Sequence, residues 1–129
     1  MILFFERKEP MSKVYVSSFD LLAARHVRDV LRANGHEVVS TWHEPGAPRP
    51  ATDTEWPQII ANNASQIQSA DALVLTSTKA DVPGGKFVEA GIAIGADKRI
   101  VVIGHRENRL LWHPSVVVVA TPEEAAAAC

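Results

Sequence analysis

Apolar residues occur along the chain in short continuous runs, and between these runs they recur at helical intervals. The runs are rich in β-branched residues, which is typical of strands buried on both faces. Five segments have this character: Lys13–Ser18, His36–Trp42, Asp71–Ser77, Ile100–Gly104 and Val116–Ala120. The spacing of apolar residues and the helix-start signals predict helices over Leu21–Asn34 and Gln58–Ala70, and from Gly85 and Pro122 onward.

Capping residues mark several ends of these helices. Asp20 is placed to act as an N-cap, and Gly35 stands where a left-handed C-cap is needed. Thr121, followed by proline and two glutamates, is a typical helix start. By contrast, residues 43–57 hold four of the chain's eight prolines and no period, which predicts a long loop.

The alternation of strands and helices predicts an α/β fold. Its sheet is expected to be mostly parallel and five-stranded, with helices on both faces. In such sheets ligands bind beyond the carboxyl ends of the strands, where the strand order reverses. The ligand-binding edge is therefore predicted at Ser17–Asp20, at Trp42 with the proline-rich loop, at Ser77–Lys86 and at Gly104–Arg109.

Length and composition fit one domain. The chain has 129 residues, of which 47% are hydrophobic and 22% charged, as in an ordinary globular protein. We assign residues 1–11 to an N-terminal extension and residues 12–129 to a single domain. The apolar run at residues 1–5 is too short to cross a membrane and lacks signal-peptide features. The single cysteine, Cys129, excludes an internal disulfide, so we expect a cytoplasmic protein with no membrane partner.

Several chemistries are disfavoured by what the sequence lacks. A net charge of −2 gives no basic surface for nucleic acid. None of the five histidines is spaced like a metal ligand with a third partner, so we expect no metal site. The motifs G-x-S-x-G, G-x-G-x-x-G and the Walker sequence are absent, which argues against a serine hydrolase, a dinucleotide enzyme and a triphosphatase.

One carboxylate, Glu89, lies near the start of an otherwise apolar helix. The partial positive charge of the helix start favours its ionised form. Gly91 and Gly95, four residues apart, are expected to let this helix lie close to a strand. The residues alone leave two interpretations of Glu89. It pairs with Lys86, an arginine or solvent, or it lines a pocket as a nucleophile or as a stabiliser of a cationic transition state.

A family resemblance favours the second interpretation. The segments "KVYVSS", "NNASQIQSADALVLTS" and "DVPGGKFVEAGIAIGADKRIVVIG" resemble the nucleoside 2-deoxyribosyltransferase-like family, which includes deoxynucleoside 5′-monophosphate N-glycosidases. The likeness spans about Lys13 to Ala125. It implies a three-layer flavodoxin/Rossmann-like sandwich. The activity it implies is that of an N-glycosidase or deoxyribosyltransferase that needs no cofactor and acts at the N-glycosidic bond of a nucleoside, a deoxynucleoside or the 5′-monophosphate. It also implies that Glu89 is the nucleophile, that Tyr15 positions it, and that the protein is a homodimer or higher homo-oligomer.

The sequence departs from the family on the base side of the site. Where the family usually has an aspartate that binds or protonates the base, this chain has Asn63. An amide can hydrogen-bond a base but cannot protonate it as a carboxylic acid does. Asp81 and His43 are the alternative candidates for protonating the base.

Further residues are candidates to contact a nucleoside or nucleotide. Ser17 and Ser18, at the end of the first strand, are candidates to bind phosphate or sugar hydroxyls, and the "PGG" turn offers its amides to phosphate. Its glycines are Gly84 and Gly85. Trp42 and Phe19 are candidates to stack on the base.

Two other functions stay open. Asn63 in place of aspartate fits a nucleotide-binding or sensing module without turnover on the same fold. A TIR-like NAD glycohydrolase also uses a glutamate on a flavodoxin-like sheet, although the match to it is shorter.

Overall fold

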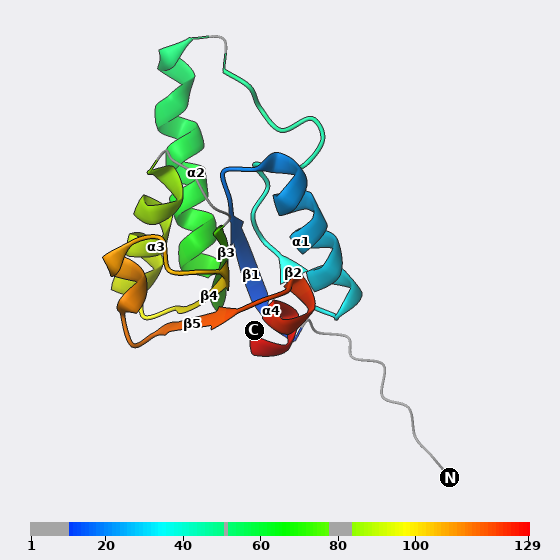
Figure 1. Cartoon of the computed structure of the whole chain (residues 1–129). Coiled ribbons are helices and arrows are strands. Elements are labelled where there is room, and N and C mark those ends of the chain that lie inside the picture. Colours follow the sequence, from blue (N-terminus) through cyan, green and yellow to red (C-terminus); the bar gives the residue numbers. More distant parts are fainter. Residues whose placement is uncertain (1–10, 51, 78–83) are drawn as a thin grey trace.

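The structure is a computed structural model that describes residues 11–50, 52–77 and 84–129 (Figure 1). Its single sheet has five strands in the order β2-β1-β3-β4-β5. Every strand pairing in it is parallel, which confirms the predicted fold class. The strands are β1 (Lys13–Ser17), β2 (Glu37–Val38), β3 (Ala72–Ser77), β4 (Arg99–Gly104) and β5 (Val116–Val119).

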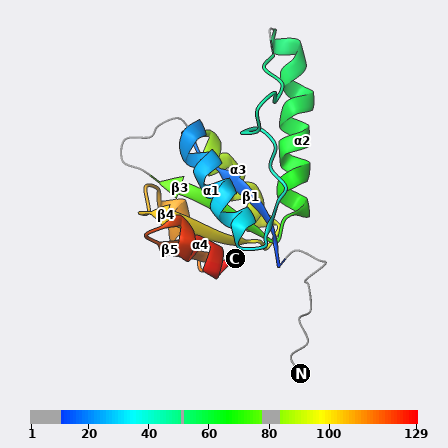
Figure 2. The same cartoon turned by 90° about the vertical axis from the view of Figure 1, so that its right-hand side faces the viewer.

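Helices cover both faces of the sheet and complete a three-layer sandwich (Figures 1 and 2). The helices are α1 (Leu21–Ala33), α2 (Trp56–Ser69), α3 (Gly85–Gly95) and α4 (Pro122–Ala128). Two hydrophobic clusters hold the layers together: α1 and α4 pack on one face of the sheet, and α2 and α3 pack on the other. In both views α2 projects well beyond the sheet.

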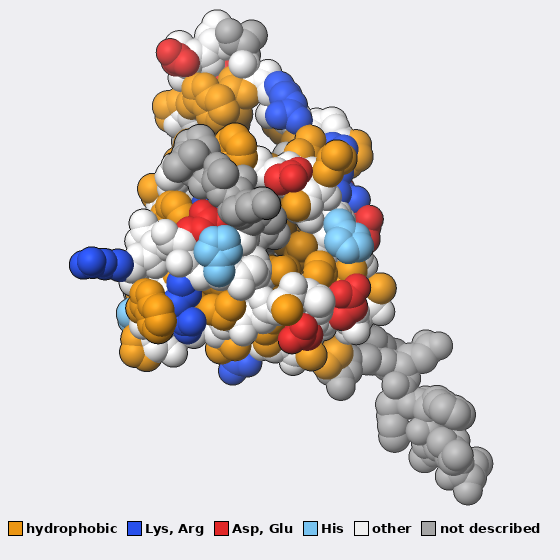
Figure 3. Space-filling model, in the orientation of Figure 1, with side chains coloured by type: hydrophobic (Ala, Val, Ile, Leu, Met, Phe, Trp, Pro, Cys, Tyr) orange, Lys and Arg blue, Asp and Glu red, His pale blue; other side chains and the backbone are white. Residues whose placement is uncertain are grey.

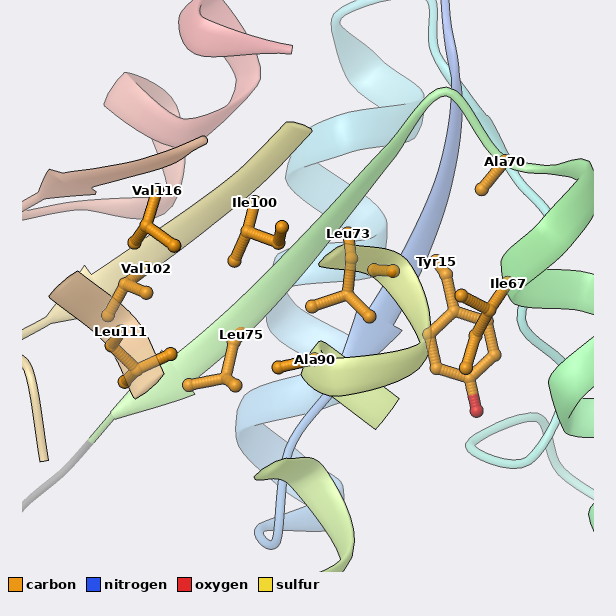
Figure 4. Packing of buried hydrophobic residues seen from close by; sticks show 11 residues of the cluster. Tyr15, Ile67, Ala70, Leu73, Leu75, Ala90, Ile100, Val102, Leu111 and Val116 are labelled. Atoms are coloured by element: carbon orange, nitrogen blue, oxygen red, sulfur yellow. The ribbon is translucent and has the colours of Figure 1, made fainter. Parts of the chain in front are cut away.

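The two-residue period of a strand divides β1 between these clusters. Val14 and Val16 are buried with the α1 and α4 cluster, whereas Tyr15 is buried with the α2 and α3 cluster. Figure 4 shows the Tyr15 ring beside Ile67 of α2, with the phenol oxygen at the far end of the ring. Ser17, two residues further along the strand, lies on the same face as Tyr15.

The strand order puts the reversal between β1 and β3. The connection from β1 leads to β2 on one side, and the later strands are added on the other side. In sheets of this kind a crevice forms at the carboxyl ends of the strands, beside the reversal in strand order. The reversal lies beside Ser17 and Ser77, the ends of the two strands from which two of the predicted binding segments start.

The predicted helix ends are confirmed. The Asp20 side chain accepts hydrogen bonds from the amides of Leu22 and Ala23, and Gly35 has a positive φ of 87°. The Thr121 side chain accepts from the amide of Glu124. No helix in the described ranges is both long enough and apolar enough to cross a membrane.

The second strand is shorter than predicted. A strand was expected over His36–Trp42, but β2 ends at Val38. Two side chains replace the backbone ladder beyond that point, because Ser40 Oγ accepts from the Val16 amide at 3.0 Å and Trp42 Nε1 donates to the Val16 carbonyl at 2.8 Å. The helix α2 begins at Trp56, earlier than expected, with proline in its first turn and a short 3₁₀ turn before it.

The expected close approach at two glycines of α3 is wrong. A Cβ added at Gly91 or Gly95 would have no heavy atom within 4 Å, so neither glycine is required for helix–strand contact. The glycine that the packing does require is Gly104, at the end of β4. It has a φ of 121°, and an added Cβ would collide with the Ser77 carbonyl oxygen.

Candidate functional site

A pocket of about 640 Å³ lies at the carboxyl end of the sheet, between α2 and α3. The turn after β1 and the segment from Thr41 to Arg49 provide its other walls. Much of the rim is apolar, and Figure 3 shows hydrophobic side chains gathered over the projecting end of α2. Trp56 and Ile60 of that helix are 45% and 56% exposed.

Glu89 of α3 lines this pocket, and two side chains of β1 hold its carboxylate by hydrogen bonds. The Tyr15 hydroxyl donates to Glu89 Oε2 at 2.5 Å. The Ser17 hydroxyl donates to Glu89 Oε1 at 2.8 Å. Both carboxylate oxygens therefore have a donor from the same strand, and the half-buried side chain is fixed at the pocket wall.

Burial and hydrogen bonding act in opposite directions on the Glu89 carboxyl. Burial raises its pKa above the ordinary value, and the two hydroxyl donors lower it, with a net raised pKa. The expectation from sequence, that the helix start favours the ionised carboxyl, did not include this burial. Burial and the neighbouring carboxylate raise the pKa of Tyr15 strongly, so the phenol stays protonated and remains a donor.

The alternative in which Glu89 pairs with Lys86 is not what the structure shows. In the described part of the chain, the carboxylate that pairs with Lys86 belongs to Glu107, with Nζ 3.1 Å from Oε2. The Ser77 hydroxyl donates to the same carboxylate at 2.6 Å, and Lys86 Nζ donates to the Thr76 carbonyl at 3.3 Å. This polar cluster ties the loop after β4 to the first turn of α3.

We predict that Glu107→Gln destabilises the protein by about 2 kcal/mol, because it removes the charge of a largely buried carboxylate that accepts hydrogen bonds from Ser77 and Lys86. The side chains of Lys86 and Glu107 are only 1% and 11% exposed. Urea denaturation of both proteins measures the difference. The matched control is Glu44→Gln, which breaks a more exposed pair with Arg32 and should cost less than about 1 kcal/mol. Equal losses in the two variants would contradict the prediction.

The structure brings most of the predicted site residues together around Glu89. Five of them line the same pocket: Ser18, Phe19, Trp42, Asn63 and Gly85. Asn63 comes from α2, across the pocket from α3. Trp42 is held by its bond to the Val16 carbonyl. Ser18 accepts a hydrogen bond from Thr76 of β3, which links the ends of β1 and β3 at the crevice.

Other predicted site residues lie elsewhere. Ser17 is fully buried beneath Glu89 and is not part of the pocket wall, so direct contact with a substrate is the wrong role for it. Gly84 precedes α3 and does not itself line the pocket. Asp81 lies outside the described residues.

His43 is also not part of the pocket wall. Its side chain is 0% exposed, and Nε2 hydrogen-bonds to Ser40 Oγ at 2.7 Å. Burial lowers the pKa of His43 to about 4. The histidine is therefore a neutral core residue behind Trp42, and its predicted role in protonating a base is wrong.

The burial of His43 predicts acid sensitivity. Between the pKa values of about 4 in the folded state and 6.5 in the unfolded state, only the unfolded chain binds the proton. The free energy of unfolding should therefore fall as the pH decreases through this range, by up to about 1.4 kcal/mol per pH unit.

Urea denaturation across this pH range, on wild type and His43→Gln, measures the contribution. The raised pKa of Glu89 acts in the opposite direction, and it cancels in the difference between the two proteins. The acid slope should be smaller in the variant. The same slope in both would contradict the prediction.

Two residues of the pocket wall were predicted only as parts of segments, not individually. Arg49 lines the pocket from the proline-rich loop, and Lys86 lines it from the first turn of α3. The irregular loop gave no periodic signal for Arg49. A signal did exist on α2, where Ile59, Asn63 and Ile67 recur every four residues and so form one face, which the structure directs into the pocket.

Comparison with known proteins identifies the family and the fold. The model of the nucleoside 2-deoxyribosyltransferase family matches residues 16–120, a span that includes Glu89. Among solved structures, a CMP N-glycosidase of Clostridium botulinum, BcmB, is similar with a TM-score of 0.59 and 15% identity. The match covers 90% of this chain and 96% of that one, and at this identity it shows the fold. No curated protein sequence matches significantly. The chain therefore belongs to the nucleoside 2-deoxyribosyltransferase family.

Proposed function

We propose that this protein cleaves the N-glycosidic bond of a nucleoside or nucleoside 5′-monophosphate, with Glu89 as nucleophile. The observation that carries the proposal is the Glu89 carboxylate at the wall of the pocket, with each oxygen held by a hydroxyl of β1. A carboxylate fixed in this way suits attack at an anomeric carbon, because loose positioning of a nucleophile is costly.

The reaction consists of two displacements at C1′. A Glu89 oxygen forms a bond to C1′ while the C1′–N bond breaks, and the electron pair goes to the base nitrogen, which takes up a proton. Water then attacks C1′, loses a proton and releases the Glu89 carboxylate. In a transferase, a second base replaces this water.

Asn63 and the aromatic residues are proposed to hold the base. Asn63 offers both a donor and an acceptor from α2, and Trp42 and Phe19 offer ring faces at the same pocket. Because Asn63 cannot supply a proton and His43 is buried elsewhere, the proton for the leaving base is proposed to come from Asp81 or from water.

A 5′-phosphate on the substrate fits the charges of the pocket. Arg49 lines it, and so do Ser18 and Gly85. Backbone amides at the start of α3, together with the Arg49 guanidinium, suit an anion. We propose that the monophosphate binds better than the free nucleoside, and that ionic strength weakens this preference.

The apolar rim of the pocket supports a homodimer. The exposed fractions of Phe19, Trp56, Ile60 and Val88 lie between 45% and 66%, and all four line the same pocket. Exposed apolar side chains gathered in one patch, rather than scattered singly, are typical of an interaction surface or a ligand-binding groove. We propose that a second copy covers this rim. Analytical ultracentrifugation should show a dimer that Ile60→Asp dissociates, and a monomeric wild type at all concentrations would refute it.

A substrate panel tests the proposed activity. The protein is incubated with deoxynucleosides, ribonucleosides, their 5′-monophosphates and NAD, and free base is measured by chromatography. We expect base from at least one nucleoside or monophosphate. Base from NAD alone would identify an NAD glycohydrolase instead.

The second candidate function is a nucleotide-binding module without turnover. Asn63 favours it, because an amide cannot protonate the leaving base as a carboxylic acid does. Thermal shifts with nucleotides but no base release at any pH from 5 to 9 would support this function against the proposed one.

A further inference from the structure

We infer that Ser17 is a positioning residue: its hydroxyl fixes Oε1 of Glu89, so that the carboxylate presents a defined oxygen to the pocket. The inference rests on the proposed function, and it gives Ser17 a role that sequence reasoning assigned to substrate contact. Three observations on β1 and α3 support it.

The first observation is that two different hydroxyls bind the two oxygens of the Glu89 carboxylate. Tyr15 binds Oε2 and Ser17 binds Oε1. A single donor would leave the carboxylate free to rotate about its last bond, whereas two donors on different oxygens fix the plane of the group. The lone pairs that remain on each oxygen are available on the pocket side.

The second observation is the partner of the Ser17 hydroxyl. Ser17 is fully buried, and its hydroxyl donates to the Glu89 carboxylate. A buried serine in a strand can satisfy its hydroxyl with a nearby backbone carbonyl. Here the partner lies 72 residues away in the chain, on α3. The contact therefore ties the ligand-binding end of β1 to the pocket helix.

The third observation is the electrostatic setting of Glu89. Among the described residues, the ionisable groups around it are Tyr15 on β1, Lys86 one turn earlier on α3, and Arg49, which lines the same pocket. The helix α2 faces the pocket with amides and has no charged residue. Lys86 is engaged with Glu107. The hydroxyls of Tyr15 and Ser17 are thus the direct donors that favour the ionised carboxylate against its burial.

The test compares Ser17→Ala with Ser40→Ala, which removes another buried serine hydroxyl next to β1, one that bonds to His43 and not to Glu89. The first measurement needs no substrate: the carboxyl carbon of Glu89 is titrated by ¹³C NMR in glutamate-labelled protein, with Glu89→Gln assigning the signal. We expect the midpoint to rise by about one pH unit in Ser17→Ala, from the loss of a hydrogen bond to a charged group. We expect no change in Ser40→Ala.

The second measurement is the pH profile of base release. In Ser17→Ala we expect kcat to fall about 10- to 100-fold with little change in KM, and the acid limb to move to higher pH. Ser17→Cys keeps a side chain of similar size but with a weaker hydrogen-bond donor, and its kcat should lie between those of wild type and Ser17→Ala. If Ser17→Ala does not fold, the kcat of Ser17→Cys tests the inference in its place.

The outcomes separate the two proposals. An unchanged Glu89 titration in Ser17→Ala overturns the role of Ser17, and so does a kcat loss that Ser40→Ala reproduces. A wild type that releases no base from any substrate refutes the proposed function, and the positioning role fails with it. A shifted titration together with the predicted kcat loss supports both.

Discussion

Glu89→Gln should lower the rate of base release at least about 10³-fold. The amide has no negative charge to offer to a developing oxocarbenium ion, and its oxygen is a weak nucleophile. The substitution keeps the size of the side chain and still accepts a hydrogen bond from Tyr15 or Ser17, which hold the carboxylate now. Because burial opposes the charge of Glu89, the free energy of unfolding should change by no more than about 1 kcal/mol.

Single-turnover assays and urea denaturation on the same preparations measure both quantities. Glu37→Gln is the matched control, because Glu37 is an exposed acid on β2 at the amino end of the sheet. It should retain the wild-type rate. A Glu89→Gln protein that keeps a tenth or more of that rate would show that Glu89 is not the nucleophile.

Gly104→Ala should destabilise the fold by at least about 3 kcal/mol, from backbone strain and steric collision together. Gly104 ends β4 with a φ of 121°, which L side chains rarely adopt, and its new methyl group would meet the Ser77 carbonyl oxygen. The contact is made by the backbones of two paired strands, β3 and β4. No flexible side chain is therefore present that could move to relieve the collision. Chemical denaturation measures the loss.

Gly91→Ala provides the matched control for this prediction. Gly91 lies inside α3 with open space where a Cβ would stand. Alanine is favoured over glycine in a helix by up to about 1 kcal/mol, so this variant should be slightly more stable than wild type. If Gly104→Ala is as stable as Gly91→Ala, the close contact between β4 and β3 is not as described.

The parts of the fold that sequence reasoning predicted correctly are those encoded locally. Asp20, Gly35 and Thr121 each act through a backbone group within a few residues, so their identities are enough to place helix ends. Strand positions followed from β-branched runs in the same way. The exception is the segment after Val38, where Ser40 and Trp42 side chains take over the hydrogen bonds of Val16.

Only two kinds of site residue could be predicted from the sequence: those that the family resemblance indicates and those that lie at the ends of strands. The resemblance singled out Glu89 and Tyr15, and the geometry joins them. The role of Ser17 depends on α3 packing against β1, and the partner of Lys86 depends on a loop 21 residues away. No local pattern encodes such long-range contacts. His43 shows the opposite error, since a histidine near a binding edge is here a buried neutral ring.

The central claim is that the Glu89 carboxylate bonds to the sugar during the reaction. Rapid acid quenching of the protein with a cleavable substrate, followed by tryptic digestion and mass spectrometry, tests it on the peptide of residues 87–98. We predict that this peptide gains the mass of the glycosyl group within the first turnover and loses it as substrate is exhausted. Full release of base with this peptide unmodified at every time point would contradict the account.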